Sequence, residues 1–153
     1  MQEITHLPHH RIVVGIDGSE QSRAALVWAM EQAAARTMPL DVVHVWHLSV
    51  SALPMGLAAE SVEPDDFSQA AKTLAEHEID WAMEHTTARP MIVRPLAIEG
   101  HPAKVLVEEA ATAELLVVGA RGIGHFAGML LGSISDYCVR HAPVPVVVVH
   151  GAH

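Results

Sequence analysis

Short apolar runs of strand length alternate along this chain with longer segments of helical pattern, and this alternation limits the possible folds more than any other feature. Ile12–Ile16 and Leu40–Trp46 are β-branched runs on either side of Glu20–Arg36, where alanine and leucine recur at helical intervals. Parallel strands need such helical crossovers, which then cover both faces of the sheet. The pattern therefore predicts an α/β fold with a parallel sheet between helices.

The rest of the chain continues this alternation. Residues 1–10 are predicted to be a flexible tail, and residues 11–150 to form a single domain. Residues 48–64 contain two prolines and a glycine without a clear period, which predicts a loop that is either a lid or a variable linker. The other predicted elements are a helix over 65–86, a strand over 91–97, a helix from Pro102 to about Ala111, a strand over 115–118, a helix over 132–141 and a strand from Val144 to Val149.

Composition excludes several classes of protein. The longest apolar stretches have the length of a strand, well short of the roughly 20 residues of a membrane span, so a soluble, cytoplasmic protein without a membrane partner is expected. The net charge is -9 and the nine Lys and Arg residues are scattered, which argues against a nucleic-acid partner. The one cysteine, Cys138, rules out an internal disulfide and is expected to be a small core residue. No His-Glu-x-x-His pattern occurs among the 12 histidines, so no dedicated histidine metal site is expected.

A glycine loop follows the predicted strand over 115–118. Gly119 and Gly122 are expected to adopt positive φ and to let main-chain N–H groups approach a ligand. Gly132 and Ser133 stand where the next helix should begin, which offers unpaired N–H groups, a positive dipole end and a hydroxyl. Together these features suit a polyphosphate. The alternative is a long flexible loop whose glycines only relieve strain.

The full spacing G-x2-G-x9-G-S, from Gly119 to Ser133, resembles the nucleotide-binding signature of the ATP-binding branch of the universal stress protein family. The resemblance extends from Arg11 to His150 and includes the G-x-P turn at residues 100–102. It implies a Rossmann-like three-layer α/β/α sandwich with a five-stranded parallel sheet of order 3-2-1-4-5, related to the adenine nucleotide alpha hydrolases. The site is then expected beyond the carboxyl ends of the first and fourth strands, where the strand order reverses.

The resemblance also implies which residues bind the nucleotide. Asp17 would lie near the ribose and a phosphate-bound metal ion, or would cap the following helix, as Ser19 also could. Arg121 could pair with a phosphate or be an exposed surface residue, and Ser135 could contact a phosphate or cap its helix. His125 and Phe126 could cover the ligand. The full predicted set is Gly15, Asp17, Val45 (through its main chain, to adenine), Gly119, Ala120, Arg121, Gly122, Gly132, Ser133, Ile134 and Ser135.

The function that this resemblance implies is an ATP-binding stress protein, with Mg²⁺ or Mn²⁺, that is non-enzymatic or barely enzymatic and whose nucleotide occupancy changes its conformation or association. A slow ATP hydrolase is one alternative, with only Asp17, Arg121 and His125 as candidate catalytic groups. A dimeric association module with incidental nucleotide binding is another. The valine run from Val144 to Val149 would be a sticky edge strand unless covered, and a homodimer through this strand is predicted.

Overall fold

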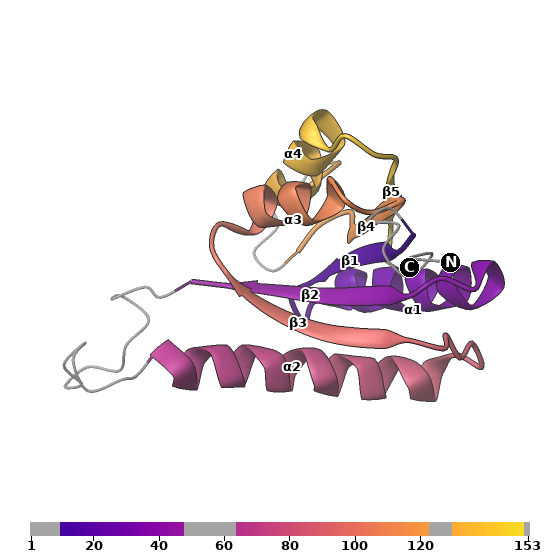
Figure 1. Ribbon diagram of the computed structural model, residues 1–153. Helices are drawn as coiled ribbons and strands as arrows, with labels where there is room; N and C mark the ends of the chain where they lie inside the picture. Colours follow the sequence, from indigo (N-terminus) through magenta and orange to yellow (C-terminus); the bar gives the residue numbers. More distant parts are fainter. Residues whose placement is uncertain (1–9, 48–63, 123–129, 152–153) are drawn as a thin grey trace, which may run out of the picture.

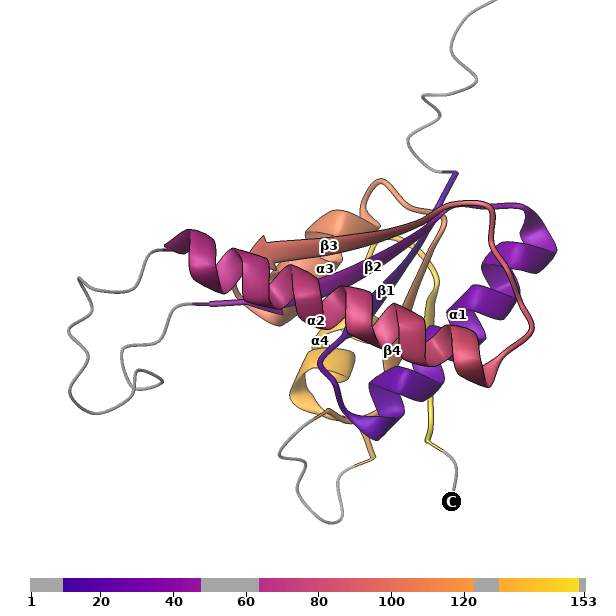
Figure 2. The same ribbon diagram turned by 90° about the horizontal axis from the view of Figure 1, so that it is seen from below.

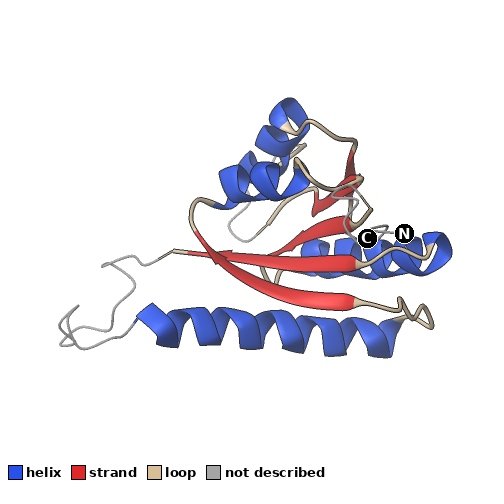
Figure 3. Cartoon of the chain, viewed as in Figure 1, coloured by secondary structure: helices blue, strands red, loops and turns tan. Residues whose placement is uncertain are grey.

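The computed structural model describes residues 10–47, 64–122 and 130–151. In these ranges strands and helices alternate along the chain (Figure 1, Figure 3). The strands are β1 (Ile12–Ile16), β2 (Leu40–Trp46), β3 (Val93–Glu99), β4 (Leu115–Gly119) and β5 (Val146–Val149). The helices are α1 (Glu20–Arg36), α2 (Pro64–His85), α3 (Pro102–Ala110) and α4 (Ser133–His141).

The five strands form one sheet of order β3-β2-β1-β4-β5, in which every neighbouring pair is parallel. This confirms the predicted α/β fold and its strand order. Helices α1 and α2 cover one face of the sheet, and α3 and α4 cover the other (Figure 1, Figure 2). Because the chain runs from β1 toward one edge and from β4 toward the other, the strand order reverses between these two neighbours.

Two apolar layers join the helices to the sheet. Val14 of β1 packs with Leu26 and Met30 of α1 on one face, while Val13 packs with Leu106 of α3 on the other. Alternate residues of a strand point to opposite faces, and all five residues of β1 are buried, as expected for a central parallel strand.

Cys138 of α4 belongs to the second of these layers, as predicted for a core residue. Its side chain is fully buried, and burial raises the pKa of its thiol to about 11. The thiol is therefore un-ionised at neutral pH, which leaves it a packing group with little nucleophilic character.

Element boundaries differ from the predicted ones mainly in β3 and β5. β3 begins at Val93 instead of residue 91, because Met91 is 86% exposed and lies outside the sheet. β5 begins at Val146 instead of Val144, since Pro143 and Pro145 lack the N–H groups that ladder pairing needs. Residues 1–9 of the predicted tail and residues 48–63 of the predicted loop lie outside the described residues. Within the described part of the chain, no helix is both long and apolar enough to cross a membrane.

A buried carboxylate lies at the amino-terminal end of the sheet, opposite the strand ends at which a ligand is expected. Asp41 at the start of β2 is 1% exposed and accepts hydrogen bonds from Arg11 and from Nε of Arg94, the latter at 2.5 Å. Arg11 also donates to the carbonyl oxygen of Glu109 at 2.9 Å and to Oγ1 of Thr112 at 2.8 Å. This cluster joins β1, β2, β3 and the end of α3 through charge-assisted hydrogen bonds.

Candidate functional site

A cavity of about 250 Å³ opens at the carboxyl ends of β1 and β4, where the strand order reverses. The predicted site residues converge on it from four separate stretches of the chain. Those that line it are Gly15, Asp17, Val45, Gly119, Arg121, Gly122, Gly132, Ser133, Ile134 and Ser135, while Ala120 is fully buried and does not.

Several lining residues are not among the predicted ones. The apolar wall includes Val43 of β2 and Leu106 of α3, and Pro102 at the start of α3 also contributes. A Cβ atom at Gly15 would lie 2.7 Å from Cδ1 of Leu106, so the glycine lets α3 lie close against β1. In the sequence, the G-x-P turn at 100–102 marked the start of this helix, but nothing indicated that its side chains border the cavity. The other unpredicted lining residues are Ile16, Ser19, Ser22, Val118 and Leu131.

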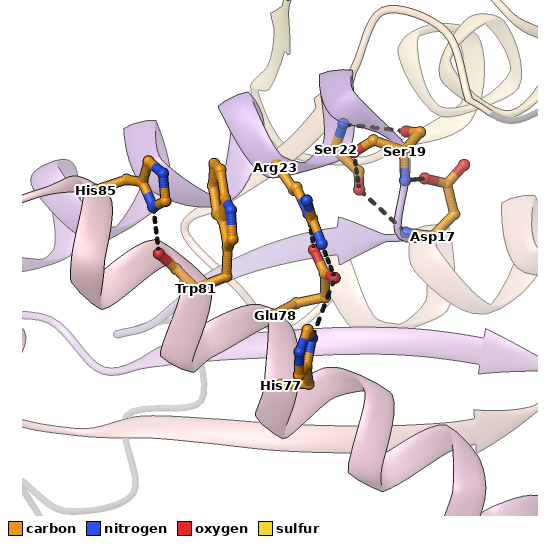
Figure 4. Close-up of polar contacts among 8 residues, drawn as sticks. All are labelled: Asp17, Ser19, Ser22, Arg23, His77, Glu78, Trp81 and His85. Carbon is orange, nitrogen blue, oxygen red and sulfur yellow. Dashed lines mark hydrogen bonds and ion pairs between the residues drawn. The ribbon is translucent and has the colours of Figure 1, made fainter.

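The turn between β1 and α1 forms one side of the cavity and is held by its own side chains (Figure 4). The Ser19 N–H donates to Oδ1 of Asp17 at 2.9 Å, and Ser19 is the N-cap of α1, since its Oγ accepts the Ser22 N–H at 3.2 Å. The Asp17 N–H in turn donates to Oγ of Ser22 at 3.3 Å. The cap is thus Ser19, and Asp17 orders the turn that precedes it.

Behind this turn, α1 is fixed to α2 (Figure 4). Arg23 donates two hydrogen bonds to the buried carboxylate of Glu78, at 2.8 and 3.0 Å, and its guanidinium lies 4.8 Å from the ring centre of Trp81. The hydrogen bond to Glu78 raises the pKa of Arg23, so the guanidinium stays charged. The ring of His85 stacks on Trp81 at 3.8 Å. These contacts hold the helix whose first turn borders the cavity.

Gly119, at the end of β4, and Gly122, just after it, allow neighbouring segments to pack closely and do not adopt unusual dihedral angles. A Cβ at Gly119 would lie 2.9 Å from the carbonyl carbon of Gln21, and one at Gly122 would lie 2.3 Å from Oδ2 of Asp17. Neither glycine has a φ between +20° and +160°, so the predicted positive φ is wrong. The missing Cβ matters because the first turn of α1 presses against the loop.

Three main-chain N–H groups of the predicted phosphate-binding residues already donate hydrogen bonds within the protein. Ala120 N–H donates to the carbonyl of Val149 at 2.9 Å, Arg121 N–H to Oε1 of Gln21 at 2.7 Å, and Gly132 N–H to the carbonyl of Ala120 at 2.7 Å. These groups fix the shape of the loop, so they are not the donors that a phosphate would meet.

Among the described residues of the predicted site, the first turn of α4 offers further main-chain N–H groups to a ligand. The first hydrogen bond of this helix runs from Asp136 N–H to the carbonyl of Gly132, so no intrahelical acceptor exists for the N–H groups of residues 133–135. Ser133 adds a hydroxyl at the cavity wall. The hydroxyl of Ser135 instead donates to the carbonyls of Ala120 at 2.7 Å and Gly132 at 3.1 Å, and the N-cap of α4 is Gly132, so Ser135 does not cap the helix as the predicted alternative had it.

The cavity therefore has an apolar wall from β2 and α3 and a positive helix end at α4, and Arg121 lines it as well. A flat apolar group joined to an anion fits this combination. Among the described residues, no cluster of three His, Cys, Asp or Glu side chains suits a metal ion, so a metal would need ligands from the bound molecule. His125 and Phe126 lie outside the described residues.

Comparison with known sequences gives related proteins over most of the chain. The model of the universal stress protein family matches residues 8–150. A universal stress protein of Mycobacterium tuberculosis is 37% identical over 141 residues, which cover 92% of this chain and 45% of that protein. One from Mycolicibacterium smegmatis is 36% identical over 138 residues, covering 90% of this chain and 45% of that protein. The chain thus spans about half the length of the curated relatives it matches.

Three solved structures of similar fold match this chain over nearly their whole length. A universal stress protein in complex with cAMP is 28% identical, with a TM-score of 0.66, over 94% of this chain and 99% of that one. The fold alone is shared with UspA from Lactobacillus plantarum, at 21% identity, a TM-score of 0.66 and coverage of 92% and 98%. The same holds for the Archaeoglobus fulgidus protein in complex with dAMP, at 20% identity, a TM-score of 0.59 and coverage of 92% and 98%. With the fold, the cavity and the matched residues in agreement, this chain belongs to the universal stress protein family.

Proposed function

We propose that this chain, as a single domain over residues 11–150, binds an adenine nucleotide in the cavity between β1 and β4. The base would lie against the apolar wall, near the main chain of Val45, and a phosphate would lie at the first turn of α4 beside Ser133. The observation that supports this most is the meeting of an apolar wall and an unpaired helix N-terminus in one cavity. Binding of cAMP and dAMP by proteins of the same fold agrees with it.

We further propose ATP with Mg²⁺ or Mn²⁺ as the ligand in the cell. The spacing of Gly119, Gly122 and Gly132-Ser133 supports a polyphosphate, and Arg121 lines the cavity beside them. Asp17, which lines the cavity beside Gly122, is the carboxylate that would face a phosphate-bound metal ion. Because the protein carries a net charge of -9, the metal ion would also screen the repulsion between protein and triphosphate.

Calorimetric titration of the nucleotide-stripped protein tests the proposed site. We expect saturable binding of ATP with Mg²⁺, compared in the same buffer with AMP and cyclic AMP. Tighter binding of ATP than of AMP supports the triphosphate, whereas equal or tighter binding of cyclic AMP would restrict the ligand to one phosphate group. Absence of binding of all three nucleotides would overturn the proposal.

Ser133→Ala should weaken nucleotide binding by roughly three- to tenfold, because one hydroxyl hydrogen bond to a charged phosphate is lost while the N–H groups of α4 remain. The measurement is the same titration. Ser68→Ala on α2, away from the cavity, is the matched control and should bind like the parent protein. Equal affinities of the Ser133 and Ser68 variants would remove the hydroxyl from the proposed site.

We infer a regulatory role, in which nucleotide occupancy changes conformation or association during the stress response of a cytoplasmic protein, in place of efficient catalysis. No group that lines the cavity, apart from Asp17 and Arg121, is placed as an acid, a base or a phosphate-pairing cation among the described residues. A slow ATP hydrolase is the alternative. Turnover that disappears in Asp17→Ala while binding persists would favour it, and turnover unchanged by that substitution would exclude it.

We also propose a homodimer through β5. This strand is at one edge of the sheet, and its four valines are only partly buried. The carbonyls of Pro145 and Val149 accept hydrogen bonds from the β4 side, so by strand alternation the main-chain groups of Val146 and Val148 face away from β4. These groups could pair with a second chain.

Light scattering of the purified protein at micromolar concentration should give the mass of a dimer. Val148→Pro removes one outward N–H without removing a hydrogen bond to β4, and it should shift the equilibrium toward monomer at least tenfold. A parent protein that is monomeric under these conditions would rule out this interface.

A further inference from the structure

Gln21, in the first turn of α1, contacts the loop after β4 without belonging to the cavity wall. Its Oε1 accepts the Arg121 N–H at 2.7 Å. Arg121 lines the cavity, whereas Gln21 does not, so this N–H is turned toward α1 and away from the ligand space. We propose that Gln21 is a positioning residue for nucleotide binding, which holds the start of the glycine loop in the conformation that the ligand needs.

The side chain of Gln21 is itself held in place by close neighbours. Gly151, after β5, lies so near that a Cβ there would be 3.0 Å from Cγ of Gln21. The main chain of Gln21 and Ser22 lies against Gly119, where a Cβ would come within 2.9 to 3.0 Å. The main chain of Gln21 is thus packed against the end of β4, and its side chain lies beside the segment after β5. A side chain restricted in this way loses little conformational entropy when it forms its hydrogen bond.

Two consecutive N–H groups of the loop are therefore fixed by different parts of the fold. Ala120 N–H is held by the carbonyl of Val149 in the sheet, and Arg121 N–H by the side chain of Gln21. The next residue, Gly122, lies against the carboxylate of Asp17. Of these three contacts, the one from Gln21 is the only one made by a neutral side chain outside the cavity wall, so it can be removed without changing the ligand's own contacts.

Loss of this hydrogen bond would leave the Arg121 N–H without its acceptor and residues 120–122 in several conformations. Binding would then have to order these residues, so the apparent affinity would fall in proportion to the fraction of molecules in the competent state. The inference rests on the proposed nucleotide site, because the loop matters only if a ligand binds beside it.

Gln21→Met is the appropriate variant, since it keeps the length and packing of the side chain and the helix propensity but lacks the acceptor. We expect nucleotide affinity to fall roughly five- to tenfold by calorimetry, and the Arg121 amide proton to exchange with solvent about tenfold faster by NMR. Gln32→Met makes the same chemical change about three turns further along α1 and should alter neither quantity. Gln21→Glu keeps an acceptor and should restore slow exchange of the Arg121 amide proton.

The outcomes separate this inference from the proposed function. A parent protein that binds no nucleotide contradicts the proposed function itself. If the parent binds nucleotide and Gln21→Met binds it equally or more tightly, the nucleotide site stands and the positioning role of Gln21 is wrong. A purely structural role for Gln21 would lower the midpoint of thermal unfolding and leave the affinity of the folded protein unchanged, which also contradicts the inference.

Discussion

Replacing Asp41 with alanine is expected to lower the free energy of unfolding by about 3 to 5 kcal/mol. The carboxylate is 1% exposed and accepts hydrogen bonds from Arg11 and Arg94, while Arg11 has a side chain only 18% exposed. Without the carboxylate, the Arg11 charge remains largely buried and its ionic partner is the Glu109 carboxylate, which is farther away, at 3.5 Å, and more exposed. Since domains of this size are stable by about 5 to 15 kcal/mol, urea denaturation followed by circular dichroism should show a large shift of the midpoint.

Asp80→Ala is the matched control for this experiment. Asp80 is an exposed residue of α2, so the substitution makes the same change of charge and should alter the free energy of unfolding by no more than about 0.5 kcal/mol. Equal effects of the two substitutions would mean that the cluster at the amino-terminal end of the sheet contributes no net stability, because water then replaces the carboxylate without cost.

Gly122→Ala is expected to weaken nucleotide binding by roughly five- to thirtyfold, measured by the same calorimetric titration. The new Cβ would lie 2.3 Å from Oδ2 of Asp17. The carboxylate cannot turn away freely because its Oδ1 accepts the Ser19 N–H at 2.9 Å. Either this hydrogen bond or the position of the loop is lost, at a cost of about 1 to 2 kcal/mol that binding must overcome.

A double-mutant cycle identifies the origin of this effect. In an Asp17→Ala background the clash is absent, so adding Gly122→Ala should change nucleotide affinity no more than about twofold. Additive effects of the two substitutions would show that the alanine methyl group disturbs something other than the carboxylate.

The fold could be predicted because each element carries its own signal. Apolar runs such as Ile12–Ile16 are strand-sized and the segments between them have helical period, so the alternation fixes the parallel sheet. Boundaries were less accurate where proline decides them, as at Pro145 before β5. Arg121 and Gly122, directly after β4, and the start of α4 at Ser133 line one cavity, as the glycine spacing predicted.

Contacts between distant segments could not be predicted from the sequence. Asp41 stands within an apolar run, but the sequence does not tell that Arg11, just before β1, and Arg94 of β3 reach it. Gln21 likewise looks like an ordinary polar residue of α1 until the fold brings Arg121 beside it, 100 positions along the chain. Gly119 and Gly122 were expected to adopt positive φ, whereas the structure shows that neighbouring segments approach them closely. Both conditions select glycine, so the sequence does not distinguish them.

The contact between Gly15 and Leu106 bears on how ligand preference can change within such a protein. A Cβ at position 15 would lie 2.7 Å from Cδ1 of Leu106, so the Leu106 side chain or α3 itself would have to shift. Pro102 and Leu106 on that helix also form the cavity wall, so a substitution at position 15 reshapes the cavity and loosens the core together. Natural variation that alters the ligand without loss of stability should therefore accumulate near Arg121 and the start of α4, while the wall formed by β1 and α3 stays fixed.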